Sequence, residues 1–155
     1  MTITAVRPIN EIIIHCSATP EGRDVSVADI RQWHLQRGFN DIGYHYVVYR
    51  DGSVHIGRPL RQVGAHCLGH NAHSVGICYI GGVEARTLKP KDTRTNEQKV
   101  ALRKLITELR TRFPKARVLG HRDTSPDKNG NGKIERWEWL KDCPCFDAVK
   151  EYSDV

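Results

Sequence analysis

The chain has 155 residues, of which 39% are hydrophobic and 27% are charged. This is the length of one domain, and it is sufficient to bury a hydrophobic core without disulfide bonds. No run approaches the roughly 18 apolar residues of a membrane span, and no signal peptide is evident near the first residue. The formal charge of +6 favours an anionic partner, such as nucleic acid, a membrane surface or the bacterial cell wall, without choosing among them.

The cysteines do not resemble a disulfide framework. Their number, five, is odd, and they include His15-Cys16 and the turn Cys143-Pro144-Cys145. We therefore expect mostly reduced thiols and synthesis in the cytoplasm without a signal peptide.

The first half of the chain predicts a strand, a helix and a hairpin. Glu11–His15 (EIIIH) is a short β-branched run, typical of a buried strand. A helix is expected from Ser26, which caps its first turn together with the acidic residue three positions on, to the glycine at 38. Residues 43–49 and 53–57 are expected to form strands joined by the Asp-Gly turn between them.

The second half predicts a loop, two strands and a longer helix. Residues 64–74 are rich in glycine and histidine, and a strand is expected at Val75–Ile80, followed by a Gly-Gly turn. A second capping box predicts a helix from Thr95 to about Phe113. A strand at 117–119 then leads to His121. With no repeat and no linker, we expect a single α/β domain over residues 1–155, with a central mixed β-sheet flanked by helices.

Histidines make a metal site plausible, but their spacing does not locate it. Four potential ligands lie close together, as local metal ligands often do: His66, Cys67, His70 and His73. On spacing alone, a polar surface loop is the favoured interpretation of this run. His15 and His121 each lie at the end of a predicted strand, and a structural role is the favoured alternative for each of them.

Six segments in order carry a resemblance to a known family. They are HCSAT at 15–19, IRQWH at 30–34, GYHY at 43–46, RDG at 50–52, GIC at 76–78 and CPCFD at 143–147. Together they resemble the type 2 N-acetylmuramoyl-L-alanine amidases, most closely the amidase-type lysozymes of T-odd phages, which share a domain with animal peptidoglycan recognition proteins. The similarity runs from about Glu11 to Asp147. It implies the fold that the zinc amidases share with the peptidoglycan recognition proteins.

The resemblance implies a zinc site. Its ligands fall on His15, His121 and Cys143. Three protein ligands with a fourth position left for water are what a catalytic zinc requires. Cys16 and Cys145 match no ligand position, and we interpret them as packed thiols.

The resemblance also implies the reaction. The bond cut would be the amide between the lactyl group of N-acetylmuramic acid and L-alanine of the stem peptide. Tyr44 and Lys141 match the catalytic positions, where a hydrogen bond and a positive charge would stabilise the oxyanion or move a proton. His66 and Asn71 match positions that line the substrate groove.

The chain departs from the phage enzymes before its last ligand. Those enzymes have a short loop between the last histidine and the cysteine ligand, whereas residues 122–142 intervene here. Residues 127–138 match an EF-hand calcium loop, with glycine at the sharp turn. The ligand positions fall on Asp127, Asn129, Asn131, Lys133 (through its carbonyl) and Glu138. The alternative is an Asn-Gly turn insert; if calcium binds, we expect weak or moderate affinity and a fixed position for Lys141 and Cys143.

Two other functions are compatible with parts of the sequence. A non-catalytic peptidoglycan-binding module is the main alternative, but such relatives typically lack the cysteine ligand that Cys143 provides. A nucleic-acid-binding regulator is suggested only by the charge. We therefore expect a monomeric zinc peptidoglycan hydrolase with no specific nucleic acid or membrane partner. It would act on the cell wall after release or delivery, as a phage lysin, a secreted effector or a bacterial enzyme.

Overall fold

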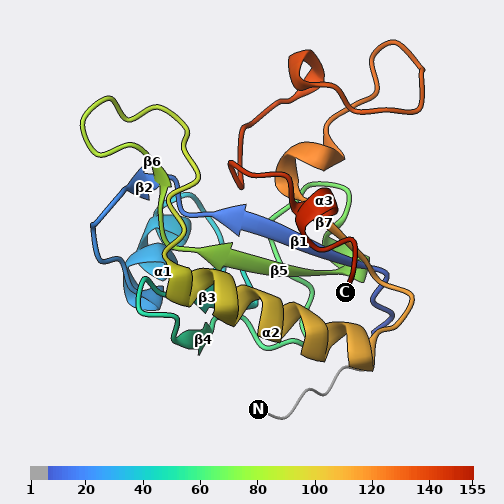
Figure 1. The fold of residues 1–155 in the computed structure, drawn as a ribbon. Helices are drawn as coiled ribbons and strands as arrows, with labels where there is room; N and C mark the ends of the chain where they lie inside the picture. The colour runs from blue at the N-terminus through green and yellow to red at the C-terminus, as the bar shows by residue number, and fades with distance from the viewer. Residues whose placement is uncertain (1–6) are drawn as a thin grey trace.

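A computed structural model describes residues 7–155, and a five-stranded mixed sheet forms its centre (Figure 1). The strands are β1 (Glu11–Cys16), β3 (Tyr46–Val48), β4 (Val54–Ile56), β5 (Ser74–Tyr79) and β7 (Arg117–Gly120). Their order is β4-β3-β5-β1-β7, and only the β3–β4 pair is antiparallel. A second, parallel pair joins β2 (Thr19–Pro20) to β6 (Gly82–Val83). The predicted mixed sheet is confirmed.

The described residues contain two long helices, which begin where the sequence predicted, and a short third helix that the sequence did not predict. They are α1 (Val27–Gln36), α2 (Asn96–Arg112) and α3 (Ala148–Glu151), with the short 3₁₀ turns η1 (Asn71–His73), η2 (His121–Thr124) and η3 (Arg136–Glu138). Both predicted capping boxes are present, at Ser26 and at Thr95. Within residues 7–155, no helix has the length and apolarity needed to cross a lipid bilayer.

The two long helices cover opposite faces of the sheet. Side chains alternate between the faces of a strand, so Ile12 and Ile14 of β1 share a face that Ile13 does not. That face packs against four buried residues of α2: Leu102, Leu105, Ile106 and Leu109. On the other face, Ile30 of α1 packs with Val47 of β3. The flanking helices predicted from the sequence are therefore confirmed.

Two predictions for the middle of the chain were wrong in detail. The strand expected at 43–49 begins only at Tyr46. The backbone N–H of Gly43 donates to His34 Nδ1 at 2.8 Å, and its carbonyl accepts from Ala65 N at 3.0 Å, so this residue pairs with a helix side chain and a loop. The turn expected at Gly81-Gly82 is replaced at Gly82 by the start of β6.

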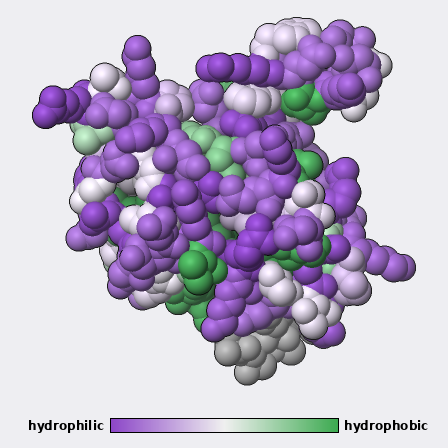
Figure 2. All heavy atoms as spheres, in the orientation of Figure 1, coloured by the Kyte–Doolittle hydropathy of each residue, from purple (hydrophilic) through white to green (hydrophobic). Residues whose placement is uncertain are grey.

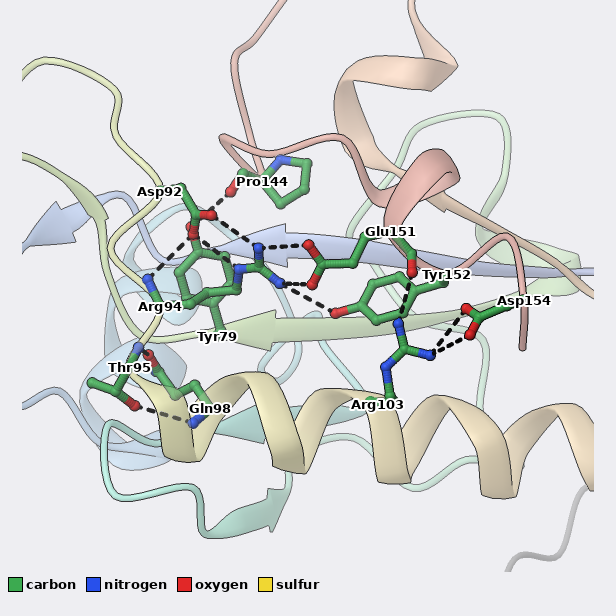
Figure 3. A network of polar contacts seen from close by, with 10 residues as sticks. All are labelled: Tyr79, Asp92, Arg94, Thr95, Gln98, Arg103, Pro144, Glu151, Tyr152 and Asp154. Atoms are coloured by element: carbon green, nitrogen blue, oxygen red, sulfur yellow. Dashed lines mark hydrogen bonds and ion pairs between the residues drawn. The ribbon is translucent and has the colours of Figure 1, made fainter.

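The C-terminal segment is attached to the body of the molecule through Arg94 (Figure 3). Its guanidinium lies 2.9 Å from Asp92 Oδ2, 3.0 Å from Glu151 Oε1, and 3.4 Å from the centre of the Phe146 ring. Nearby, the Tyr79 hydroxyl donates to the Pro144 carbonyl at 2.7 Å. These contacts fix the Cys-Pro-Cys turn and the residues that follow it.

The insert between His121 and Cys143 stands away from the sheet. It forms the orange-to-red loop at the upper right of Figure 1 and a separate, largely hydrophilic lobe in Figure 2. Of its side chains, Glu138 is fully buried, whereas Trp137 is 58% exposed. The insert is thus folded around its own buried carboxylate.

Two histidines are built into the fold as hydrogen-bond acceptors. His34 Nδ1 accepts from the backbone N–H of Gly43, and His45 Nδ1 accepts from that of Gly76 at 3.0 Å. Burial is the main reason that the pKa of each histidine is lowered to about 4. Protonation at Nδ1 would also destroy the accepted hydrogen bond.

The free energy of unfolding is therefore expected to fall as the pH falls below about 6.5. Between pH 6.5 and 4 the unfolded chain binds protons that the folded chain excludes, so each histidine costs roughly 2 kcal/mol of stability by pH 5. Urea unfolding across this range, at constant zinc, measures the effect. In the double variant His34→Gln, His45→Gln the slope of the unfolding free energy against pH should be shallower than in wild type. Equal slopes in wild type and double variant would contradict the assignment.

Candidate metal centre and active site

Strand pairing brings two distant histidines together. In the parallel register of β1 and β7, Ile13 pairs with Leu119 and Ile14 with Gly120. The next residue of each segment is a histidine, His15 and His121, and their ring centroids lie 4.6 Å apart. The backbone hydrogen bonds between β1 and β7 therefore place both histidines at the same end of the sheet.

Cys143 reaches the same point from the end of the insert. Its sulfur accepts a hydrogen bond from the backbone N–H of Cys16 at 3.1 Å, and its carbonyl accepts from Arg122 N at 2.8 Å. A methyl group at Gly120 would lie 2.6 Å from Pro144 Cδ, so only glycine allows the Cys-Pro-Cys turn to approach this closely. Potential ligand atoms of His15, His121 and Cys143 all lie within 4.8 Å of one another. Two imidazoles and one thiolate form a donor set typical of zinc.

A third histidine lies behind the first. His66 Nδ1 and His15 Nε2 share a hydrogen bond of 2.8 Å, and His66 Nε2 is 3.1 Å from Ser74 Oγ. The His66 ring packs directly against Gly76, where an added Cβ would come within 2.6 Å of it. This chain of contacts fixes the orientation of the His15 ring.

The two histidines of the cluster are kept neutral. Burial, followed by the nearby imidazoles of His66 and His121, holds the pKa of His15 well below its ordinary value. Burial and the charge of Lys141 lower the pKa of His121 to about 4. Metal ligands must be deprotonated, so both rings are ready to bind an ion at neutral pH.

A cavity of about 620 Å³ opens over this cluster. Tyr44 lies in its wall with its ring centroid 5.1 Å from that of His15, and burial raises the pKa of its hydroxyl well above the ordinary value. Lys141 lines the same cavity. Among the described residues that line it, none is aspartate or glutamate, whereas Arg37 and Lys141 are cationic. The cavity therefore suits an anionic substrate.

All the residues that the resemblance nominated for zinc, catalysis and substrate line this cavity: His15, Tyr44, His66, Asn71, His121, Lys141 and Cys143. Asn71 Oδ1 accepts from the backbone N–H groups of His66 and Cys67, both at 2.9 Å, so its oxygen shapes the loop. The five positions of the calcium-like loop lie outside the cavity. The run from His66 to His73 does not form one site. His66 and Cys67 line the cavity, whereas His70 and His73 contact Glu11.

Sequence reasoning did not identify several residues of the cavity wall. His34, Arg37 and Phe39 come from α1 and the segment after it, and Leu68 and Leu140 come from two loops. His34 lies within one of the segments that carry the resemblance, which was the available signal. The two leucines had none, because an exposed leucine in a loop has no distinguishing pattern.

Comparisons with known proteins identify the family and the fold. A family model described as N-acetylmuramoyl-L-alanine amidase matches residues 5–134. The endolysin of Klebsiella phage KP32 is 41% identical over 132 residues, covering 85% of this chain and 86% of its own. The amidase LysC from Clostridium intestinale has the same fold, with a TM-score of 0.70 and 24% identity over 97% of this chain and 90% of its own. Drosophila peptidoglycan recognition protein LB gives a TM-score of 0.69 at 28% identity, over 97% of this chain and 82% of its own. The predicted fold and family are confirmed: the chain belongs to the N-acetylmuramoyl-L-alanine amidases and is a peptidoglycan-hydrolysing enzyme.

Proposed function

We propose that this amidase is zinc-dependent and cleaves the bond between N-acetylmuramic acid and L-alanine of the stem peptide. The observation that carries the proposal is the meeting of His15, His121 and Cys143 at the floor of a cavity. The family model ends at residue 134, so the role of Cys143 rests on this geometry. Because phage endolysins are among the relatives, we also propose that it acts on the cell wall after release or delivery.

Hydrogen bonds from neighbouring residues orient two of the proposed ligands, His15 and Cys143. The Cys16 N–H donates to the Cys143 sulfur and so fixes the position of that sulfur. Because His15 Nε2 is engaged by His66, its Nδ1 is the nitrogen left for an ion. A bound zinc supplies Lewis-acid chemistry, lowering the pKa of water to about 7 and polarising a carbonyl. His66 thus serves as a positioning residue for His15, in addition to the groove position that it lines.

Tyr44 and Lys141 are the proposed catalytic residues. Hydrolysis of an amide passes through a tetrahedral intermediate whose oxyanion needs a donor or a cation nearby. The Tyr44 hydroxyl keeps its proton at neutral pH, since its pKa is raised, and can donate it in a hydrogen bond. The ammonium of Lys141, which lines the same cavity, provides a point charge, and Arg37 adds a second cation that suits the carboxylates of a stem peptide.

Product analysis on a defined muropeptide tests the proposal. Wild-type enzyme should release a peptide with a free L-alanine amino group and a sugar with a free lactyl carboxylate. A chelator should abolish release, and added zinc should restore it. Cleavage at another bond, binding without cleavage, or full activity in the presence of the chelator would each overturn the proposal.

We further propose that the insert binds calcium with weak or moderate affinity. Four side chains of the loop turn their oxygens inward onto backbone N–H groups: Asp127, Asn129, Asn131 and Glu138. The glycine at the sharp turn, Gly132, has a φ of +81°, which favours glycine. These positions match an EF-hand loop, in which Lys133 contributes its carbonyl. A bound ion would stiffen the insert that carries Lys141 and Cys143.

Calcium is expected to raise the melting temperature of chelator-treated, zinc-restored protein. A ligand at 100 times its Kd contributes about 2.7 kcal/mol, which corresponds to several degrees for a chain of this size. Asp127→Ala should lose the shift, because it removes both carboxylate oxygens that face the loop. Lys128→Ala, at a position that contributes no ligand, should keep it. An identical response to calcium in wild type and Asp127→Ala would exclude this site.

A further inference from the structure

The two ends of β1 carry two different clusters. His15 lies near the carboxyl end, in the cavity, and Glu11 lies at the amino end, where only 6% of its side chain is exposed. Glu11 Oε1 accepts from His70 Nδ1 at 2.8 Å and from His73 Nε2 at 3.1 Å. Potential ligand atoms of these three residues lie within 4.8 Å of one another.

Local structure presents both histidines on the same side. His70 caps the 3₁₀ turn η1 and His73 ends it. A 3₁₀ helix has three residues per turn, so side chains three positions apart are nearly eclipsed. The turn is held against β1 because Asn10 N donates to the His73 carbonyl at 2.9 Å, and the strand register pairs Glu11 with Ser74.

The three groups lie close enough together to share one ion, and without an ion the same distances make ordinary hydrogen bonds. Two imidazoles point at one carboxylate oxygen, and the separations of 2.8 and 3.1 Å are close to the roughly 3.3 Å between ligands of a tetrahedral ion with bonds of about 2.0 Å. His70 and His73 are 31% and 36% exposed, so an ion can enter from solvent. Each neutral ring would then carry its proton on its other nitrogen.

The carboxylate is held ready for this role. Its second oxygen, Oε2, accepts from Arg117 Nη2 at 3.2 Å. Such a partner outside the ligand set orients a ligating carboxylate.

We propose that Glu11, His70 and His73 form a second zinc site, separate from the catalytic centre, in which the ion braces the loop at 64–74 against β1. Two imidazoles and a carboxylate, with a position left for water, suit zinc among the common divalent ions. The braced loop also carries His66, which contacts His15, and Asn71 in the cavity wall. The ion would therefore stabilise one side of the cavity without taking part in the reaction.

Zinc stoichiometry tests the proposal. Chelator-treated protein is titrated with Zn²⁺ by calorimetry, and bound metal is counted after equilibrium dialysis. Wild type should bind two ions per chain, and the double variant His70→Gln, His73→Gln should bind one. These two side chains are partly exposed, so their replacement preserves the fold better than replacement of Glu11 would. His55→Gln, a histidine on β4 outside both clusters, should still bind two.

Cobalt distinguishes the two sites. The ion at Cys143 should give a thiolate charge-transfer band, which the double variant keeps and Cys143→Ser loses, while Cys143→Ser retains one bound ion. One ion in wild type together with the thiolate band, or two ions in the double variant, would overturn the second site. Absence of the thiolate band would count against the catalytic zinc alone, so the two proposals fail separately.

Discussion

Replacing Cys143 with serine is expected to reduce amide hydrolysis to the level of a buffer control. The hydroxyl of serine does not ionise near neutral pH and is a poor zinc ligand, so His15 and His121 would remain as an incomplete set. The fold should be preserved, because the Cys16 N–H that donates to the sulfur can donate to an oxygen in the same place. Release of peptide from a defined muropeptide measures activity, and circular dichroism checks the fold.

The matched control is Cys145→Ser, two residues further on. The Cys145 sulfur lies 4.0 Å from that of Cys16 and donates to the Gly82 carbonyl at 3.2 Å, a contact that a serine hydroxyl can replace. This variant should keep most of the activity. Equal losses in the two variants would show that the turn as a whole, and not a ligand at Cys143, is what the enzyme needs.

Elements with local signals were predictable from the sequence. The starts of α1 and α2 follow from capping boxes, in which the side chains and backbone groups lie within one turn. The pairing of β2 with β6 joins only two residues from each strand, and α3 is four residues long. Such short elements form because the rest of the fold holds their residues in place. They are too short for a hydrophobic periodicity that would predict them from the sequence.

In the candidate site, too, local spacing in the sequence was informative only in part. Spacing drew attention to the run from His66 to His73, but the structure divides that run between the cavity and Glu11. Its partners lie on β1, more than 50 positions away along the chain, and only strand pairing brings them close. The resemblance could nominate His15, His121 and Cys143 because it compares whole segments; spacing alone could not.

The largest expected effect on stability comes from Arg94→Met. The Arg94 side chain is 2% exposed and bonds both Asp92 and Glu151 (Figure 3). Methionine keeps the apolar length of the side chain but leaves the two carboxylates facing each other without a cation. Breaking a buried ion pair in this way costs about 3 kcal/mol, the lower end of the usual range, because both carboxylates retain some contact with water.

Urea unfolding measures this loss, and Arg103→Met is the matched control from the same network. Arg103 is 44% exposed and bonds the Asp154 carboxylate at 3.0 Å, so its replacement should cost less than about 1 kcal/mol. Arg94→Lys should resemble Arg94→Met more than wild type, because an ammonium cannot bond two carboxylates through paired N–H groups as a guanidinium does. If Arg94→Met unfolds at the same urea concentration as Arg103→Met, the C-terminal segment depends on its apolar contacts, through Phe146 and Tyr152, and not on the buried cation.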